Sequence, residues 1–203
     1  MPNVSKAVLL VGVAWLLLAT ALGASGMIRV LPPAAAPVVI FGLTAAVLVA
    51  WWRRPGFRRW IDHLDERWLV GLHVTRFVGA YFLYLYGRGQ LPYAFAVPGG
   101  WGDITVASLA VGLLALGPPR DTPRRAAYVG WNVLGLLDIL FVVTTAARLL
   151  ATDPGSMAAL QRLPLSLLPT FLVPLIIASH VVLAVKLARP EPRGRAIRTP
   201  GAI

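Results

Sequence analysis

Long apolar stretches separated by short polar segments dominate the chain. Six of them are long enough to cross a bilayer, whose hydrocarbon core needs about 20 apolar residues per helix. They lie at about residues 7–24, 35–52, 68–87, 103–118, 127–149 and 164–187. None shows the strict polar–apolar alternation of a membrane β-barrel strand, and helices satisfy their own backbone hydrogen bonds in lipid. The pattern therefore predicts an all-α transmembrane bundle of six spans, formed as one domain by residues 1–188.

The fourth span is short in strictly apolar residues, and its start depends on the segment before it. The segment before it, Gly87 to Gly102, is apolar for a loop and contains Pro92 and Pro98. Proline removes a helical hydrogen bond and glycine lowers helix stability, so we expect an irregular outer loop that can dip into the membrane as a re-entrant element. Asp103 would then cap the fourth helix by accepting hydrogen bonds from its free N–H groups, or it would belong to a site in this outer loop.

Residues 55–67, between the second and third spans, have an amphipathic pattern. Aromatic and aliphatic residues recur there at helical spacing, including Phe57, Trp60 and Ile61, and charged residues fill the other face. This pattern predicts a short helix that lies in the head-group layer of the membrane.

The distribution of basic residues predicts the orientation of the bundle. Of 19 Lys and Arg residues, fourteen fall on the side that carries both chain ends, four fall on the opposite side, and Arg76 lies inside a span. This bias places both termini in the cytoplasm. It also accounts for the net charge of +11, so anionic lipid head groups are the expected partners of the basic loops and nucleic acid is not. The basic segment 189–203 is expected to be a disordered cytoplasmic tail.

The first span admits two interpretations. Lys6 and the small residues near Ala21 resemble parts of a cleaved signal peptide. The apolar run from Ala7 to Gly23 is longer than the apolar region of a signal peptide, which favours a retained helix. Cleavage would leave five spans and the same orientation for the rest.

Ionisable and amide side chains lie inside three of the spans, where they are costly and therefore call for an explanation. Span three carries His73 and Arg76, span five carries Asn132 and Asp138, and span six carries His180. With a rise of about 1.5 Å per residue, all five fall roughly 8–16 Å from the cytoplasmic edge. Matching depth on three helices predicts one polar cluster in the cytoplasmic half of the bundle.

Opposite charge and overlapping reach predict an ion pair between Arg76 and Asp138. Asn132 lies about 120° round its helix from Asp138, so it is expected to bond a neighbouring backbone instead. The cluster has two interpretations: it holds the helices together, or it lines a functional cavity that binds a solute or protons. The two histidines favour the second, because an imidazole can change its protonation near neutral pH.

Pro174 predicts a break in the last span. Its missing N–H leaves the carbonyl of Thr170 without a helical donor, six residues before His180. A kink or a water-accessible break is the expected result.

Several strings, including Arg76-Phe77-Val78-Gly79, Trp131 to Asp138, and Pro169 to Pro174 followed by His180, resemble a family of small bacterial integral membrane proteins of about this length. The similarity covers roughly residues 65–187. The resemblance implies a bacterial inner membrane and no assigned activity. It also implies that relatives carry glutamine at the position of His73, which argues against an obligatory ligand role for that residue.

Three functions are compatible with these observations. The first is a small-solute or proton-coupled carrier, in which Arg76 holds an anionic group or neutralises Asp138 and His180 exchanges protons. Such a carrier would need a homo-oligomer to form a pathway. The second is an electron-transfer protein with His73 and His180 as axial ligands of haem b. The third is a non-catalytic assembly subunit of a membrane complex.

The absent motifs narrow the function further. The chain has no cysteine, which excludes thiolate metal sites and cysteine catalysis, and it lacks the glycine-rich phosphate loop and the metalloprotease and serine-hydrolase motifs. No residue is assigned a catalytic role, no metal other than haem iron is expected, and a non-enzymatic function is favoured.

Overall fold

The computed structural model describes residues 2–32 and 35–189. Within these ranges the chain forms eight α-helices and no strand. Six helical segments are long and apolar enough to cross a membrane, which confirms the predicted all-α, six-span fold. They are Val4–Ala24, Ala35–Arg53, Glu66–Gly87, Tyr93–Leu116, Thr122–Thr152 and Leu168–Ala188. The chain therefore has the structure of a multi-pass membrane protein. Of the predicted tail, all but Arg189 lies outside the described residues.

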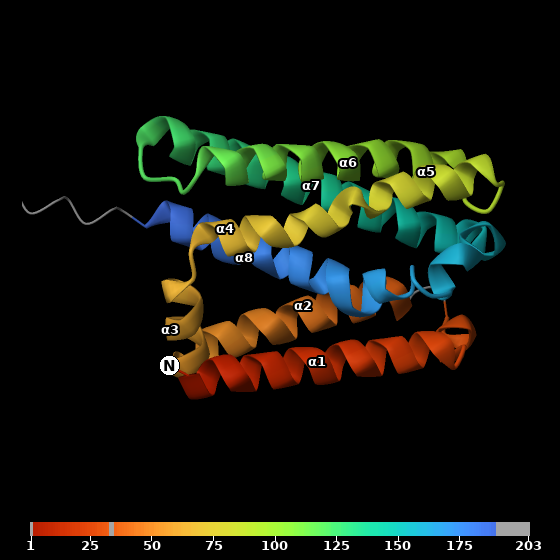
Figure 1. The fold of residues 1–203 in the computed structure, drawn as a ribbon. Coiled ribbons are helices and arrows are strands. Elements are labelled where there is room, and N and C mark those ends of the chain that lie inside the picture. Colours follow the sequence, from red (N-terminus) through yellow and green to blue (C-terminus); the bar gives the residue numbers. More distant parts are fainter. Residues whose placement is uncertain (1, 33–34, 190–203) are drawn as a thin grey trace, which may run out of the picture.

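The spans run back and forth along one axis (Figure 1). On one side lie α1 (Pro2–Ala24) and α2 (Ala35–Arg53), joined through the 3₁₀ turn η1 (Met27–Val30). On the other side lie α5 (Gly79–Gly87), α6 (Tyr93–Leu116) and α7 (Thr122–Thr152), and α8 (Val173–Ala188) runs between the two sides. The N-terminus and the end of α8 lie at the same end of the bundle, which we call the N-terminal end.

The amphipathic segment forms helix α3 (Pro55–His63), which is four residues shorter than predicted. It ends where the ammonium of Lys186, on α8, donates hydrogen bonds to the carbonyls of Ile61, Asp62 and Leu64. The same ammonium forms an ion pair with Glu66 at 3.3 Å. A buried lysine thereby satisfies carbonyls that the end of a helix leaves free, and it fixes α3 to the N-terminal end of the bundle (Figure 1).

The third span is continuous but changes its helical pitch. It begins as α4 (Glu66–Gly71), tightens to a 3₁₀ helix in η2 (Leu72–Val78), and continues as α5. Every third residue from Val70 to Leu85 is buried, including His73, Arg76 and Gly79. A 3₁₀ helix has three residues per turn, so residues three apart lie directly above one another and face the same neighbours.

The fourth span begins at Tyr93, ten residues before the predicted start, so the expected re-entrant loop is wrong. Pro92 lies just before the helix, and Pro98 lies in its second turn. There the missing N–H frees only the carbonyl of Ala94, an exposed residue near the helix end, so the disruption is small. Glycines that looked like helix breakers instead allow close packing: a Cβ on Gly100 would lie 2.8 Å from the carbonyl oxygen of Gly79.

The last span changes its helical pitch next to Pro174, where a kink or a water-accessible break was expected. The π-helical turn η4 (Leu168–Leu172) precedes α8, and the span starts at Leu168 instead of residue 164. The preceding connection contains the 3₁₀ helix η3 (Pro154–Gln161). The carbonyl of Thr170, which Pro174 deprives of its helical donor, accepts a hydrogen bond of 2.8 Å from the indole N–H of Trp15 in α1.

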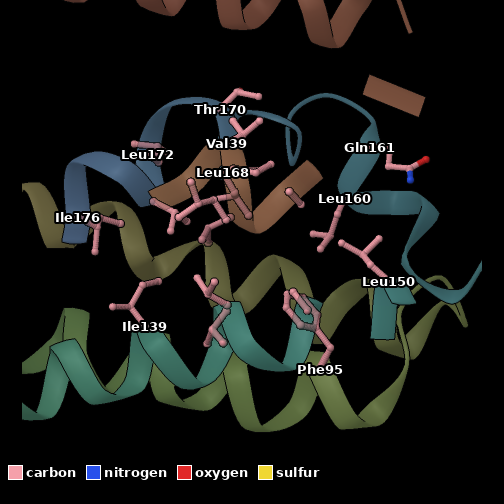
Figure 2. Close-up of a pocket in the computed structure, with 18 of the residues that line it drawn as sticks. Val39, Phe95, Ile139, Leu150, Leu160, Gln161, Leu168, Thr170, Leu172 and Ile176 are labelled. Carbon is pink, nitrogen blue, oxygen red and sulfur yellow. The ribbon is translucent and has the colours of Figure 1, made fainter. Parts of the chain in front are cut away.

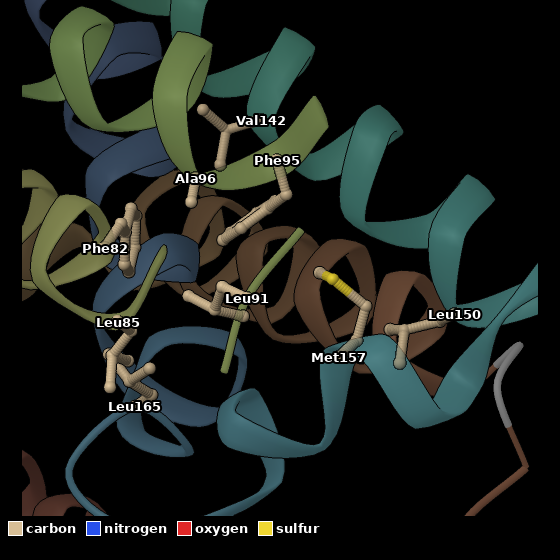
Figure 3. Packing of buried hydrophobic residues seen from close by; sticks show 9 residues of the cluster. All are labelled: Phe82, Leu85, Leu91, Phe95, Ala96, Val142, Leu150, Met157 and Leu165. Atoms are coloured by element: carbon tan, nitrogen blue, oxygen red, sulfur yellow. The ribbon is translucent and has the colours of Figure 1, made fainter. Parts of the chain in front are cut away.

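Apolar clusters fill the bundle above and below the polar residues. At the end opposite the N-terminus, side chains of α5, α6, α7 and η3 pack together, with Phe82, Phe95 and Met157 among them (Figure 3). A second cluster, which includes Val106, Tyr128 and Leu183, packs towards the N-terminal end. The polar cluster is thus enclosed along the bundle axis by apolar packing.

Candidate functional site

Arg76 is the centre of the buried polar residues. The 3₁₀ pitch of η2 places it directly above His73, and each of these residues is 1% exposed. All three guanidinium nitrogens donate: Nε to Asp103 Oδ1 at 2.6 Å, Nη1 to the carbonyl of Gly135 at 3.0 Å, and Nη2 to Asp138 Oδ2. The predicted Arg76–Asp138 ion pair is therefore confirmed.

Asp103 is the second carboxylate partner of Arg76, and its predicted role as a helix cap is wrong. Because α6 begins at Tyr93, Asp103 lies well inside that helix, where every backbone N–H already has a helical partner. Its side chain instead meets η2 and α5 at a close helix contact, where a Cβ on Gly79 would lie 2.8 Å from the Cβ of Asp103. The absence of a side chain at Gly79 thus makes room for the Arg76–Asp103 pair.

The formal charges of Arg76, Asp103 and Asp138, which we together call the Arg76 group, do not cancel. The guanidinium of Arg76 lies between the carboxyl groups of Asp103 and Asp138, so the three side chains have a formal net charge of −1 when all of them are ionised. Both carboxyl groups are largely shielded from solvent, with side-chain exposures of 5% and 15%. An unbalanced buried charge is costly. The group is therefore suited to hold one extra positive charge, which a proton or a cation can supply.

The two intramembrane histidines lie in contact with each other on the N-terminal side of Arg76. The ring centroids of His73 and His180 are 4.3 Å apart, and both rings contact the indole of Trp131. Gly135 makes room for the His180 ring, because a Cβ at that position would lie 2.7 Å from Cε1. Gly135 contacts both parts of the cluster: it lies against the His180 ring, and its carbonyl accepts a hydrogen bond from Arg76.

Asn132 holds His180 in place. Its amide nitrogen donates to the backbone carbonyl of His180 at 3.2 Å, and its amide oxygen lies 2.8 Å from Nδ1 of the ring. The expected bond from Asn132 to a neighbouring backbone is thus confirmed, and the ring contact adds to it. Ser179, the neighbour of His180 in α8, contacts His73 Nε2 at 3.0 Å. The predicted convergence of residues from spans three, five and six is confirmed, while their role in binding a solute or protons stays a prediction.

An apolar cavity of about 110 Å³ reaches the Arg76 group from the side of α2 (Figure 2). Val39, Ile139, Leu168 and Phe95 are typical of its lining, and Arg76 and Asp103 also line it. Asp138, His73, Asn132 and His180 do not line it. Of the two aspartates that bind Arg76, only Asp103 is therefore a lining residue of the cavity.

The histidine pair does not fit the haem alternative. A porphyrin must lie between its two axial ligands, whereas the two imidazoles are in direct contact at a centroid separation of 4.3 Å. No space for a macrocycle separates them. The arrangement therefore argues against His73 and His180 as axial ligands of haem b.

Comparison with known proteins places the chain in a family and adds no activity. Neither the curated proteins nor the solved structures contain a match to it. One family model matches residues 33–188, a range that begins before α2 and ends with α8, and it includes every member of the polar cluster. The chain belongs to the family described as Domain of unknown function (DUF8737).

Proposed function

We propose that this integral membrane protein is a carrier that exchanges a small organic cation for a proton at the Arg76–Asp103–Asp138 group. The observation that carries the proposal is that one arginine binds two buried aspartates, a formal charge of −1, and that Arg76 and Asp103 line an apolar cavity inside the bundle. One proton or one monovalent cation brings the group to zero charge. Both together would leave a charge of +1 and neither would leave −1, so low-dielectric surroundings favour one bound partner at a time.

The charge and contacts of Arg76 favour a cation over an anion as the solute. The sequence alone left open an anionic group bound by Arg76. All three of its guanidinium nitrogens already donate within the protein, to Asp103, Asp138 and Gly135. Asp103 is the aspartate of this group that lines the cavity, so it is the group that would contact a cation and release a proton. The apolar lining suits an alkyl body on that cation.

A flux measurement tests this function. Purified protein is reconstituted into liposomes that are acidic inside, and uptake of tetramethylammonium is followed together with the internal pH. We expect uptake coupled to a rise in internal pH, and we expect Asp103→Asn to abolish both. Asp62→Asn is the matched control, because Asp62 forms an ion pair with Arg189 at the N-terminal end of the bundle, away from the cavity. Wild-type uptake no faster than that of empty liposomes, as a purely structural assembly subunit would give, overturns the proposal.

We further infer that the N-terminal end faces the cytoplasm of a bacterial inner membrane, because the basic residues concentrate there. The chain has no native cysteine, so single cysteines report accessibility without background. Arg58→Cys and Arg88→Cys place exposed thiols at opposite ends of the bundle. An impermeant maleimide should label the second in intact spheroplasts and the first only after lysis. The reverse pattern would overturn the orientation.

A further inference from the structure

A second cavity, of about 420 Å³, lies at the end of the bundle opposite the N-terminal end. Two segments that are far apart in the sequence form it: the end of α5 with the loop to α6, and η3 with the connection to η4 (Figure 1). It shares no lining residue with the apolar cavity beside Arg76. It is therefore separate from the proposed carrier site.

Polar side chains distinguish this second cavity from the apolar one. Tyr81, Gln90, Ser156 and Arg162 line it, and its wall is more polar than apolar. Among the described residues that line it, Arg162 is the only charged one. The cavity thus carries a single positive charge surrounded by groups that form hydrogen bonds.

The side chains of Arg162 and Gln90 are free to bind a ligand. Both residues are exposed. Neither the guanidinium of Arg162 nor the carboxamide of Gln90 forms a hydrogen bond or an ion pair with any residue in the described part of the chain. A positive charge with unused N–H donors at the wall of a cavity favours an anion as the ligand.

The backbone on both sides of the cavity is held in place. Gly89 has a φ of 68°, the left-handed conformation that ends α5, and the N–H of Gln90 donates to the carbonyl of Leu85 at 2.9 Å. On the opposite wall, the N–H of Arg162 donates to the carbonyl of Ala159 at 3.2 Å. A preformed wall lowers the entropy cost of ordering the site when a ligand binds.

We propose that this cavity binds a small organic carboxylate through Arg162. A guanidinium binds a carboxylate by two parallel hydrogen bonds. The carboxamide of Gln90 and the hydroxyl of Tyr81 both donate and accept, so they suit a hydroxyl group beside the carboxylate. Leu85 and Leu91, which are buried and also line the cavity, suit a short carbon chain. A hydroxy acid of the size of lactate has all three features.

The charge of the cavity favours a carboxylate over phosphate. Phosphate takes a second negative charge near neutral pH, and Arg162 can balance only one. Free N–H groups at the start of a helix often bind phosphate. At the start of η3, however, Asp153 Oδ1 accepts from the N–H of Ser156 at 3.4 Å. The carboxylate of Asp153 also repels a second negative charge at this position.

Direct binding of lactate to the whole purified protein in detergent tests the site. Saturation-transfer NMR titrations should show lactate binding, with weaker binding of propionate, which lacks the hydroxyl, and none of inorganic phosphate. We expect Arg162→Gln to abolish lactate binding. Arg162→Lys keeps the charge but loses the paired donors, so it should weaken binding by about 10-fold. Arg88→Gln is the matched control, because Arg88 is exposed at the same end of the bundle and does not line the cavity.

A measurement on the wild-type protein keeps the test independent of variant folding. With ¹⁵N-labelled arginine, lactate should shift the Nε signal of Arg162 and leave that of Arg88 unchanged. Absence of lactate binding, unchanged binding by Arg162→Gln, or equal shifts of both arginine signals would each overturn the proposal. Binding of propionate or phosphate as tight as that of lactate would overturn it too. Neither measurement involves transport, so a failure here is distinct from a failure of the proposed carrier function.

Discussion

The indole N–H of Trp15 donates a hydrogen bond of 2.8 Å to the carbonyl of Thr170, across 155 positions of sequence. Pro174 has no N–H to donate to that carbonyl, so α1 supplies the hydrogen-bond donor that the last span lacks. The ring of Trp15 also packs edge-to-face on Phe171 at 5.0 Å. The first helix is thereby fixed to the π-helical turn η4, which contributes Leu168, Pro169, Thr170 and Leu172 to the wall of the apolar cavity.

Replacing Trp15 by phenylalanine tests this contact. The Trp15→Phe variant keeps an aromatic ring against Phe171 but leaves the carbonyl of Thr170 without a donor in an apolar environment. We expect the free energy of unfolding to fall by about 1–3 kcal/mol, measured by denaturant titration in detergent. Trp52→Phe is the control, because Trp52 is 74% exposed in α2. Equal effects of the two substitutions would show that the hydrogen bond contributes nothing.

The charges of the Arg76 group predict that replacing Arg76 lowers stability strongly and that replacing Asp103 as well recovers part of the loss. Arg76→Gln leaves Asp103 and Asp138 facing each other without a cation, which should cost about 3–5 kcal/mol of stability. Removing one of the two uncompensated charges in the same background, by Asp103→Asn, should recover part of that loss. Thermal unfolding of the single and double variants measures the difference.

Arg67→Gln provides the comparison for a surface pair. Arg67 binds Asp65 in an exposed ion pair, and such pairs contribute little to stability because water already solvates both charges. A double variant at positions 76 and 103 that is less stable than Arg76→Gln alone would contradict the assignment of excess negative charge to this group.

The spans and the Arg76–Asp138 pair could be predicted because they depend on quantities that the sequence carries directly. Mean hydropathy over about 20 residues locates a span. A fixed rise per residue then gives the depth of each polar side chain, and Arg76, Asp138 and His180 come out at similar levels. No knowledge of how the helices pack is needed for either step.

The second partner of Arg76 was missed because proline and glycine were interpreted as helix breakers. In the bundle, Pro98 lies close enough to the helix end to be tolerated, and Gly100 serves close packing. The burial of every third residue from Val70 to Leu85, which accompanies the 3₁₀ pitch through His73 and Arg76, is visible only in the structure. The Trp15 contact also had no signal in the sequence, since nothing in a sequence pairs residues 15 and 170.

Replacing Gly135 by alanine tests the packing around the His180 ring. An alanine there would place its Cβ 2.7 Å from Cε1 and 3.0 Å from Nε2 of His180, and 3.1 Å from Val106. The ring would have to move away from Asn132, so we expect Gly135→Ala to lower the thermal unfolding temperature. It should also shift the ¹⁵N signals of His180.

Gly130→Ala is the matched control in the same helix. A Cβ at that position meets nothing within 4 Å, and alanine favours helices by about 1 kcal/mol over glycine. Gly130→Ala should therefore leave the stability unchanged or raise it slightly. A His180 spectrum that is identical in the Gly135→Ala and wild-type proteins would contradict the predicted displacement of the ring.

Asp65 gives the fold a dependence on acid pH. It caps α4 by accepting from the backbone N–H of Arg67, and the side-chain hydrogen bond from Arg67 is the main reason that the pKa of Asp65 lies below its ordinary value of 3.8. A carboxyl whose pKa is lower in the folded protein stabilises the fold fully above 3.8, and this stabilisation is lost as the pH falls through the lower folded value. Asp65→Ala should therefore cost about 0.5–1 kcal/mol at neutral pH, at the low end for a helix cap because the side chain is partly exposed. The difference in unfolding free energy between this variant and the wild type should shrink below pH 3.8, and a difference that stays constant with pH would show that the ionised carboxylate is not the capping group.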